Sequence, residues 1–73
     1  MASKHHEAAV FAAMVKNARE AKGWTQEELA DKAAMRVLTI RKIEEAAFNP
    51  RYKTIHRLCD TLDIVLDAPL SSY

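Results

Sequence analysis

Two short helix-forming segments joined by a three-residue turn constrain the fold of this chain more than any other feature. Thr25 precedes the first segment, and Glu28 lies three residues after Thr25. At this spacing a threonine hydroxyl and a glutamate carboxylate can each bond the other's backbone, which starts a helix at Thr25. The second segment covers about residues 36–45, and residues 33–35 join the two. The sequence therefore predicts two consecutive helices held at a tight turn.

Apolar residues at helical spacing predict one further helix on each side of this pair, at about residues 6–22 and 52–62. Gly23 follows the first helix and is predicted to cap its C-terminus. Pro50 separates the third and fourth helices, because the residue before a proline is pushed out of the α region. The residues predicted to face the core are Phe11, Met14, Val15, Ala18, Leu29, Ala30, Ala33, Met35, Ile40, Ile43, Ile55, Leu58 and Leu62.

The segment after the fourth helix differs in kind. Residues 63–67 are short, β-branched and bounded by acids, and Pro69 blocks continuation as helix. We predict a short strand, whose unpaired backbone groups are most easily satisfied by the same strand of a second copy. The predicted dimer contacts are Ile64, Val65 and Leu66. The expected fold is all-α, with four helices and a C-terminal β-strand, in one domain over residues 1–73 with its core at about 6–62 and a tail at 63–73.

Composition and charge narrow the class of protein. The chain has 73 residues, a net charge of +1 and one cysteine, so a disulfide framework is excluded and a cytoplasmic location is expected. We find no apolar run of about 18 residues, so no membrane span is expected. The positive charge is concentrated in residues 36–57, which contain six basic and two acidic residues and have a net charge of +4. The basic residues are Arg36, Arg41, Lys42, Arg51, Lys53 and Arg57, and the acidic residues are Glu44 and Glu45. Such a concentration is typical of a phosphate-binding surface.

Catalytic and metal-binding patterns are weak. His56 and Cys59 are spaced i, i+3, and His5, His6 and Glu7 are consecutive, but neither set gives a closed tetrahedral site. There is no nucleophile–base–acid set and no phosphate-binding loop. We therefore expect neither an enzyme nor a cofactor or metal site.

Residues 23–30, Gly-Trp-Thr-Gln-Glu-Glu-Leu-Ala, followed by residues 39–44, Thr-Ile-Arg-Lys-Ile-Glu, resemble the phage-repressor and Cro family (Xre family) of helix-turn-helix proteins. The resemblance covers roughly residues 11–66. It implies that the chain binds double-stranded DNA and that its third helix enters the major groove.

The resemblance also implies roles for particular residues. Gln26 matches the glutamine that bonds a backbone phosphate and braces the third helix, and Arg19 and Glu44 match an ion pair between the first and third helices. Arg51 matches a position that faces the backbone or the minor groove. The base-reading positions are Arg36, Val37, Leu38, Arg41 and Lys42, and the phosphate candidates that follow Arg51 are Lys53 and Thr54.

Val37 and Leu38 have three interpretations: contact with thymine methyl groups, a patch that binds another protein, or packing within the domain. The chain also departs from the family at three positions. Ala34 and Ala46 stand where glycine is usual, and Arg36 replaces the usual serine cap, which predicts a shifted turn or helix start.

The function predicted from these features is sequence-specific DNA binding by a homodimer at an inverted-repeat operator, as a transcriptional repressor. One alternative is an antitoxin that also binds its toxin, because the tail is similar to that of HipB-type antitoxins. A second alternative is a protein-binding adaptor on the same fold.

Overall fold

A computed structural model describes residues 4–47 and 49–65 of the chain, with side chains from residue 8 on. It contains four helices: α1 (Lys4–Ala21), α2 (Gln26–Ala33), α3 (Val37–Glu44) and α4 (Tyr52–Leu62). Their bounds lie within two residues of the predicted ones, and the all-α class is confirmed. In the described part of the chain, no helix is both long enough and apolar enough to cross a bilayer.

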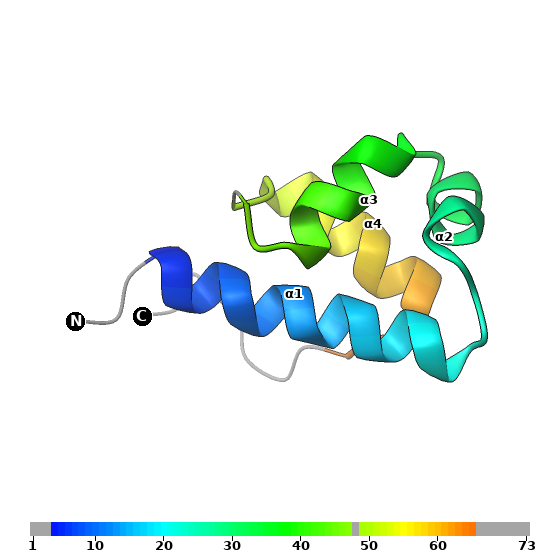
Figure 1. The fold of residues 1–73 in the computed structure, drawn as a ribbon, viewed down its shortest axis with the longest axis horizontal. Helices are drawn as coiled ribbons and strands as arrows, with labels where there is room; N and C mark the ends of the chain where they lie inside the picture. The colour runs from blue at the N-terminus through cyan, green and yellow to red at the C-terminus, as the bar shows by residue number, and fades with distance from the viewer. Residues whose placement is uncertain (1–3, 48, 66–73) are drawn as a thin grey trace.

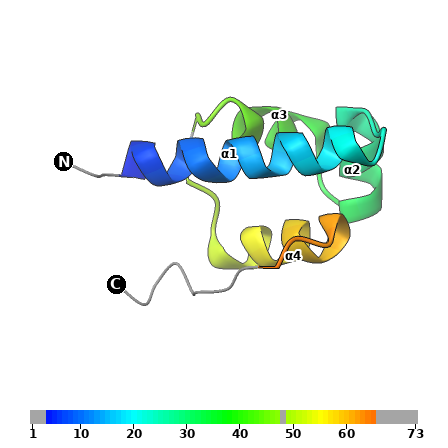
Figure 2. The ribbon, with the colours of Figure 1, turned by 90° about the horizontal axis from the view of Figure 1, so that it is seen from below.

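The longest helix, α1, packs against two of the other three. α1 packs against α3 on one side and α4 on another, while α2 packs against α3 and α4 near the C-terminal end of α1 (Figure 1). The view from below shows α1 and α4 running in roughly the same direction (Figure 2). This arrangement leaves one long side of α3 free of other helices.

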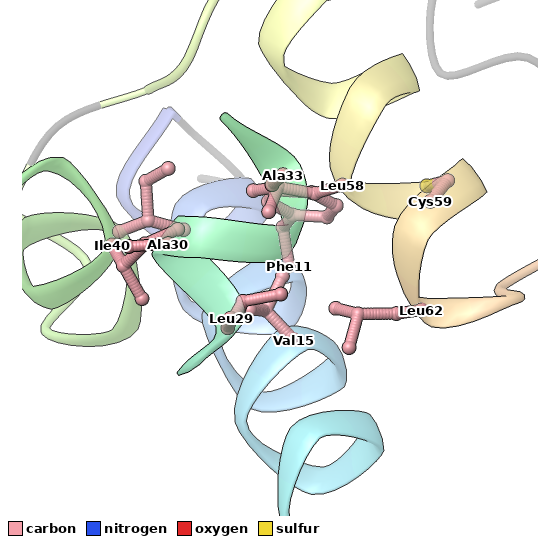
Figure 3. Close-up of a cluster of buried hydrophobic side chains, with 10 residues drawn as sticks. Phe11, Val15, Leu29, Ala30, Ala33, Ile40, Leu58, Cys59 and Leu62 are labelled. Carbon is pink, nitrogen blue, oxygen red and sulfur yellow. The ribbon is translucent and has the colours of Figure 1, made fainter. Parts of the chain in front are cut away.

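Apolar side chains from all four helices meet in one core (Figure 3). The largest side chains with almost no exposure are Val15, Leu29, Ile40, Ile43 and Leu58. α2 contributes small residues besides Leu29, namely Ala30 and Ala33, which lets its neighbours approach closely. Nearly every residue predicted to face inward lies in this core or packs against it. Cys59 is also buried there, and burial raises the pKa of its thiol, so it stays protonated near neutral pH.

Trp24 lies at the corner between α1 and α2, where it is partly buried and packs against the core. The ammonium groups of Lys22 and Lys32 lie 5.4 and 4.9 Å from the centre of its ring, within cation–π range. Lys22 also forms an ion pair of 2.8 Å with Asp63, which joins the end of α1 to the end of α4. The tryptophan is therefore part of the scaffold.

All four helices end in the same way, with one residue in the left-handed conformation. These residues are Gly23, Ala34, Ala46 and Asp63, with φ between 56° and 74°. At each end two backbone bonds close the last turn; for α2 they run from Ala34 N–H to Asp31 and from Met35 N–H to Ala30. This pair of bonds is the Schellman motif. The sequence predicted only the cap at Gly23.

The two alanines that replace glycine keep this conformation. Ala34 has φ 56° and ψ 46°, and Ala46 has φ 57°. At both positions the closing hydrogen bonds and the packing of α2 and α3 hold the left-handed geometry that glycine would adopt without strain.

The helix starts fall into two kinds. α2 begins with the predicted capping box, in which Thr25 Oγ1 accepts from Glu28 N–H at 3.0 Å and Glu28 Oε1 accepts from Thr25 N–H at 2.8 Å. α3 begins after Arg36 and α4 after Arg51, and within the described residues no side chain caps either start. An arginine has no acceptor to offer, so the first N–H groups of both helices lack this partner.

The segment after α4 does not form the predicted strand in the residues that the structure describes. Asp63 is the left-handed cap of α4, and Ile64 packs against the core while its N–H donates to Cys59 O at 2.8 Å. These two residues complete the helix end, which removes them from any strand. Val65 is 81% exposed. Leu66, Asp67 and Pro69 lie outside the described residues.

Candidate nucleic-acid interface

A network of three side chains fixes α3 to the rest of the domain. Arg19 on α1 donates to both oxygens of Glu44, from Nε to Oε2 at 2.7 Å and from Nη2 to Oε1 at 3.0 Å. Its third donor, Nη1, reaches the carbonyl oxygen of Trp24 at 2.8 Å. Gln26 on α2 donates from Nε2 to Glu44 Oε1 at 3.1 Å. One carboxylate near the end of α3 is thus held by α1 and α2 together.

Burial makes this network strong. The Arg19 and Glu44 side chains are only 11% and 4% exposed, and the hydrogen bond to Glu44 is the main reason that the pKa of Arg19 rises above its usual value. Removing one partner of such a pair costs about 3–5 kcal/mol, because the other charge stays buried alone. The network therefore sets the orientation of α3, and Gln26 keeps a second amide hydrogen for another acceptor.

The free side of α3 carries most of the residues implied to read bases. Leu38, Arg41 and Lys42 are exposed, and Arg36 is exposed just before the helix. Val37 is half-buried and packs against the core, so packing is the interpretation that fits this residue. Leu38 is 52% exposed. The two aliphatic residues that the sequence treats alike therefore have different surroundings.

An open hollow of about 470 Å³ lies along the exposed side of α3. Its lining combines one aliphatic side chain with donors: Arg36, Leu38, Thr39, Lys42 and Ala47. Arg41 is not part of the lining, because each helical residue is turned by about 100° from the one before and Arg41 falls on the other side of Leu38. Thr39 was absent from the sequence candidates, although its place three residues after Arg36 puts it on the same side.

A second hollow, of about 130 Å³, lies between the start of α3 and the first turns of α4. It is lined by Met35, Lys53, Thr54 and Arg57. Arg57 belongs to the basic stretch, but the family resemblance implies no role for it; it lies four residues after Lys53 on α4, one turn further along the same side. Its guanidinium is held near the turn by a long contact of 3.5 Å from Nη1 to Ala34 O. Three side chains with donors thus converge beside the turn.

The surface formed by residues 36–57 is more positive than the sequence count suggests. The six basic residues between positions 36 and 57 are all exposed, whereas Glu44 is neutralised by Arg19. Glu45 is the remaining acidic residue in that stretch and is exposed. A surface with this balance favours a polyanion.

The described residues offer little for other chemistry. Within them, no three His, Cys, Asp or Glu side chains gather where a metal ion could be held. His56 lies 3.9 Å from Asp60 on the exposed side of α4, while Cys59 is buried on the other side. The side chains of His5, His6 and Glu7 lie outside the described residues.

A small four-helix domain with a buried clamp on its third helix and a basic surface around that helix belongs to the class of DNA-binding domains. Comparison with protein families supports this directly. Residues 15–67 match the family model described as helix-turn-helix. The chain belongs to the helix-turn-helix family of the phage-repressor and Cro (Xre) type, whose members are DNA-binding rather than catalytic domains. None of the curated proteins searched matches the chain.

Proposed function

We propose that this chain is a sequence-specific transcriptional regulator, a repressor that binds double-stranded DNA as a homodimer at an inverted-repeat operator. The observation that carries the proposal is the exposed side of α3, where Arg36, Leu38 and Lys42 surround one hollow while the opposite side is clamped through Glu44. A rigid helix with exposed, chemically varied side chains suits direct readout in the major groove.

Phosphate contacts would supply the affinity. Lys53, Thr54 and Arg57 converge on the hollow beside the turn, and Arg51 is exposed just before α4. Gln26 lies at the start of α2 with one amide hydrogen unused, close to the end of α3 that it braces. The uncapped N–H groups at the starts of α3 and α4 add partial positive charge. These groups position α3 without reading sequence themselves.

The antitoxin and adaptor hypotheses are less well supported. The antitoxin hypothesis depends on the tail strand, and the described part of that tail is a helix cap followed by a core residue. The adaptor hypothesis depends on an apolar patch made by Val37 and Leu38, but Val37 packs against the core and Leu38 is surrounded by donors. Neither observation favours a toxin or another protein of different sequence as a partner.

Salt dependence of binding to random duplex DNA tests the general proposal. Each phosphate that the protein neutralises contributes about 0.9 to the slope of log affinity against log salt concentration. We expect a clear slope for the wild type. The double substitution Lys53→Gln, Arg57→Gln should lower that slope by about 1.8 if each residue meets one phosphate.

Lys16→Gln is a matched control, because Lys16 is an exposed lysine on α1, outside the interface. It should leave the slope nearly unchanged. A wild-type protein whose affinity for duplex DNA does not change with salt would contradict the proposed function. A slope that is unchanged in the double variant would contradict the placement of the phosphate contacts.

A further inference from the structure

Leu38 is exposed and takes no part in the packing of the core. It is 52% exposed on α3, while the residues of α3 that serve the core are Ile40, Ile43 and the half-buried Val37. A single exposed leucine is ordinary on a protein surface. This one, however, lies in the hollow of about 470 Å³ on the helix that is proposed above to enter the major groove, with donors on both sides of it.

The donors around Leu38 are free to act on a ligand. Within the residues that the structure describes, neither Arg36 nor Lys42 takes part in an ion pair, although both are exposed. Thr39 adds a hydroxyl to the same lining, and Ala47 closes it with a methyl group. The hollow therefore presents one apolar contact flanked by two cations.

The edges of the base pairs offer a matching pattern. In the major groove the C5-methyl group of thymine is the apolar feature, and guanine presents two acceptors, O6 and N7, to a cation. Leu38 and Lys42 are four residues apart, about 6 Å along the helix axis, and project within about 40° of each other. Base pairs are stacked about 3.4 Å apart, so the two side chains reach bases one or two steps apart.

We propose that the hollow on α3 reads a C5-methylated pyrimidine next to, or one step from, a guanine: Leu38 contacts the methyl group and Lys42 donates to the guanine. The methyl group can belong to thymine or to 5-methylcytosine, because both carry it at the same place on the groove edge. The inference rests on the proposed DNA-binding function and names the chemical group that the binding site selects.

The test uses the full chain and the duplex that it prefers from a random pool. Each thymine of a half-site is replaced in turn by uracil, which lacks only the C5-methyl group. At one position we expect binding to weaken about fourfold, which is the effect on affinity of losing one buried methyl group. Replacing the same base pair by cytosine–guanine and by 5-methylcytosine–guanine should show the same factor in favour of the methylated base.

Two variants separate Leu38 from general effects. Leu38→Ala should bind the thymine duplex more weakly and lose the difference between thymine and uracil. Val10→Ala truncates a similarly exposed side chain, 48% exposed on α1, and should keep that difference. Unfolding temperatures of both variants should equal that of the wild type, since neither residue is buried. For the second contact, 7-deazaguanine at the neighbouring guanine should weaken the wild type but not Lys42→Met, whose side chain has no donor.

Several results would overturn the inference. They are a wild type that binds every uracil duplex as tightly as the thymine duplex, a Leu38→Ala variant that still distinguishes the two, and a preferred duplex without thymine in its half-sites. In all of these the protein still binds DNA, so the proposed function stands. Absence of salt-dependent binding to any duplex would contradict the proposed function itself.

Discussion

Ala34 holds a conformation that an L-amino acid with a side chain adopts at a cost. Its φ of 56° and ψ of 46° bring the Cβ close to the backbone, which costs roughly 1–2 kcal/mol relative to glycine. Ala34→Gly should therefore raise the free energy of unfolding by about 1 kcal/mol, since part of the gain is offset by the greater freedom of glycine in the unfolded chain. In a domain of this size the melting temperature should rise by about 4–8 °C.

The matched control for this substitution is Ala13→Gly. Ala13 is an exposed alanine in the middle of α1, where glycine lowers stability by about 1 kcal/mol. Thermal unfolding followed by circular dichroism measures both. If Ala34→Gly also lowered the melting temperature, Ala34 would not have the left-handed conformation.

Single residues were predictable from sequence where their chemistry is distinctive. Gly23 signals a helix end because glycine favours positive φ, whereas Ala34 and Ala46 carry no such signal and take that conformation from the chain around them. The contact between Arg19 and Glu44 followed from a family resemblance rather than from their separation of 25 residues. Val37 and Leu38 have nearly the same side chain, and only the rotation of α3 separates them.

At the scale of elements, the two helices that border the proposed interface begin at arginines. α2 has a complete capping box, but Arg36 and Arg51 occupy the cap positions of α3 and α4. Serine at such a position typically raises the free energy of unfolding by about 1 kcal/mol, because its side-chain oxygen accepts a hydrogen bond from a backbone N–H of the first turn. The placement of arginine there is explained if its charge meets DNA, a use of the residue that lowers stability.

Arg36→Ser tests this explanation by separating the two properties. We expect the free energy of unfolding to rise by about 1 kcal/mol and the affinity for DNA to fall by about 1–3 kcal/mol if Arg36 reads a base. Arg36→Ala removes the same charge without adding a cap, so it should lose the affinity but not gain the stability. Denaturant unfolding and fluorescence anisotropy measure the two quantities. Equal affinity of Arg36→Ser and wild type would exclude Arg36 from the interface.

The helices were predictable because the apolar pattern and the caps that indicate them extend over many residues. The structure of the tail was not predictable, since the pattern that indicates it covers only a few residues. Residues 63–67 satisfy the composition of a strand, yet Ile64 also satisfies the apolar position that follows a Schellman motif. Sequence alone does not rank these two uses of one isoleucine. The core offers Ile64 a place within the same chain, and this local contact needs no second molecule.

At the scale of the whole molecule, one copy of this domain covers little sequence. α3 has eight residues, so it is about 12 Å long and spans about four base pairs. So short a site recurs throughout any genome, where non-specific sites compete for the protein. Two copies would double the sequence read, with recognition helices about 34 Å apart in successive major grooves. The domain is 34 Å along its longest axis, so two adjacent copies can span that distance.

Val65 marks where a second copy would meet the described part of the tail. It is 81% exposed, and it follows Ile64, whose N–H is already bonded to Cys59 O. Any pairing between tails must therefore begin at Val65 or beyond.

Val65→Pro removes a ladder donor, and a proline just after a helix cap is compatible with the cap. We expect sedimentation to show a shift from dimer to monomer, with the circular dichroism of the four helices preserved. Val65→Thr keeps the N–H and the β-branch and should remain dimeric. If Val65→Pro sediments with the same mass as the wild type, the tail is not the dimer contact. If the wild type binds its operator as a monomer, the proposed inverted-repeat operator is wrong.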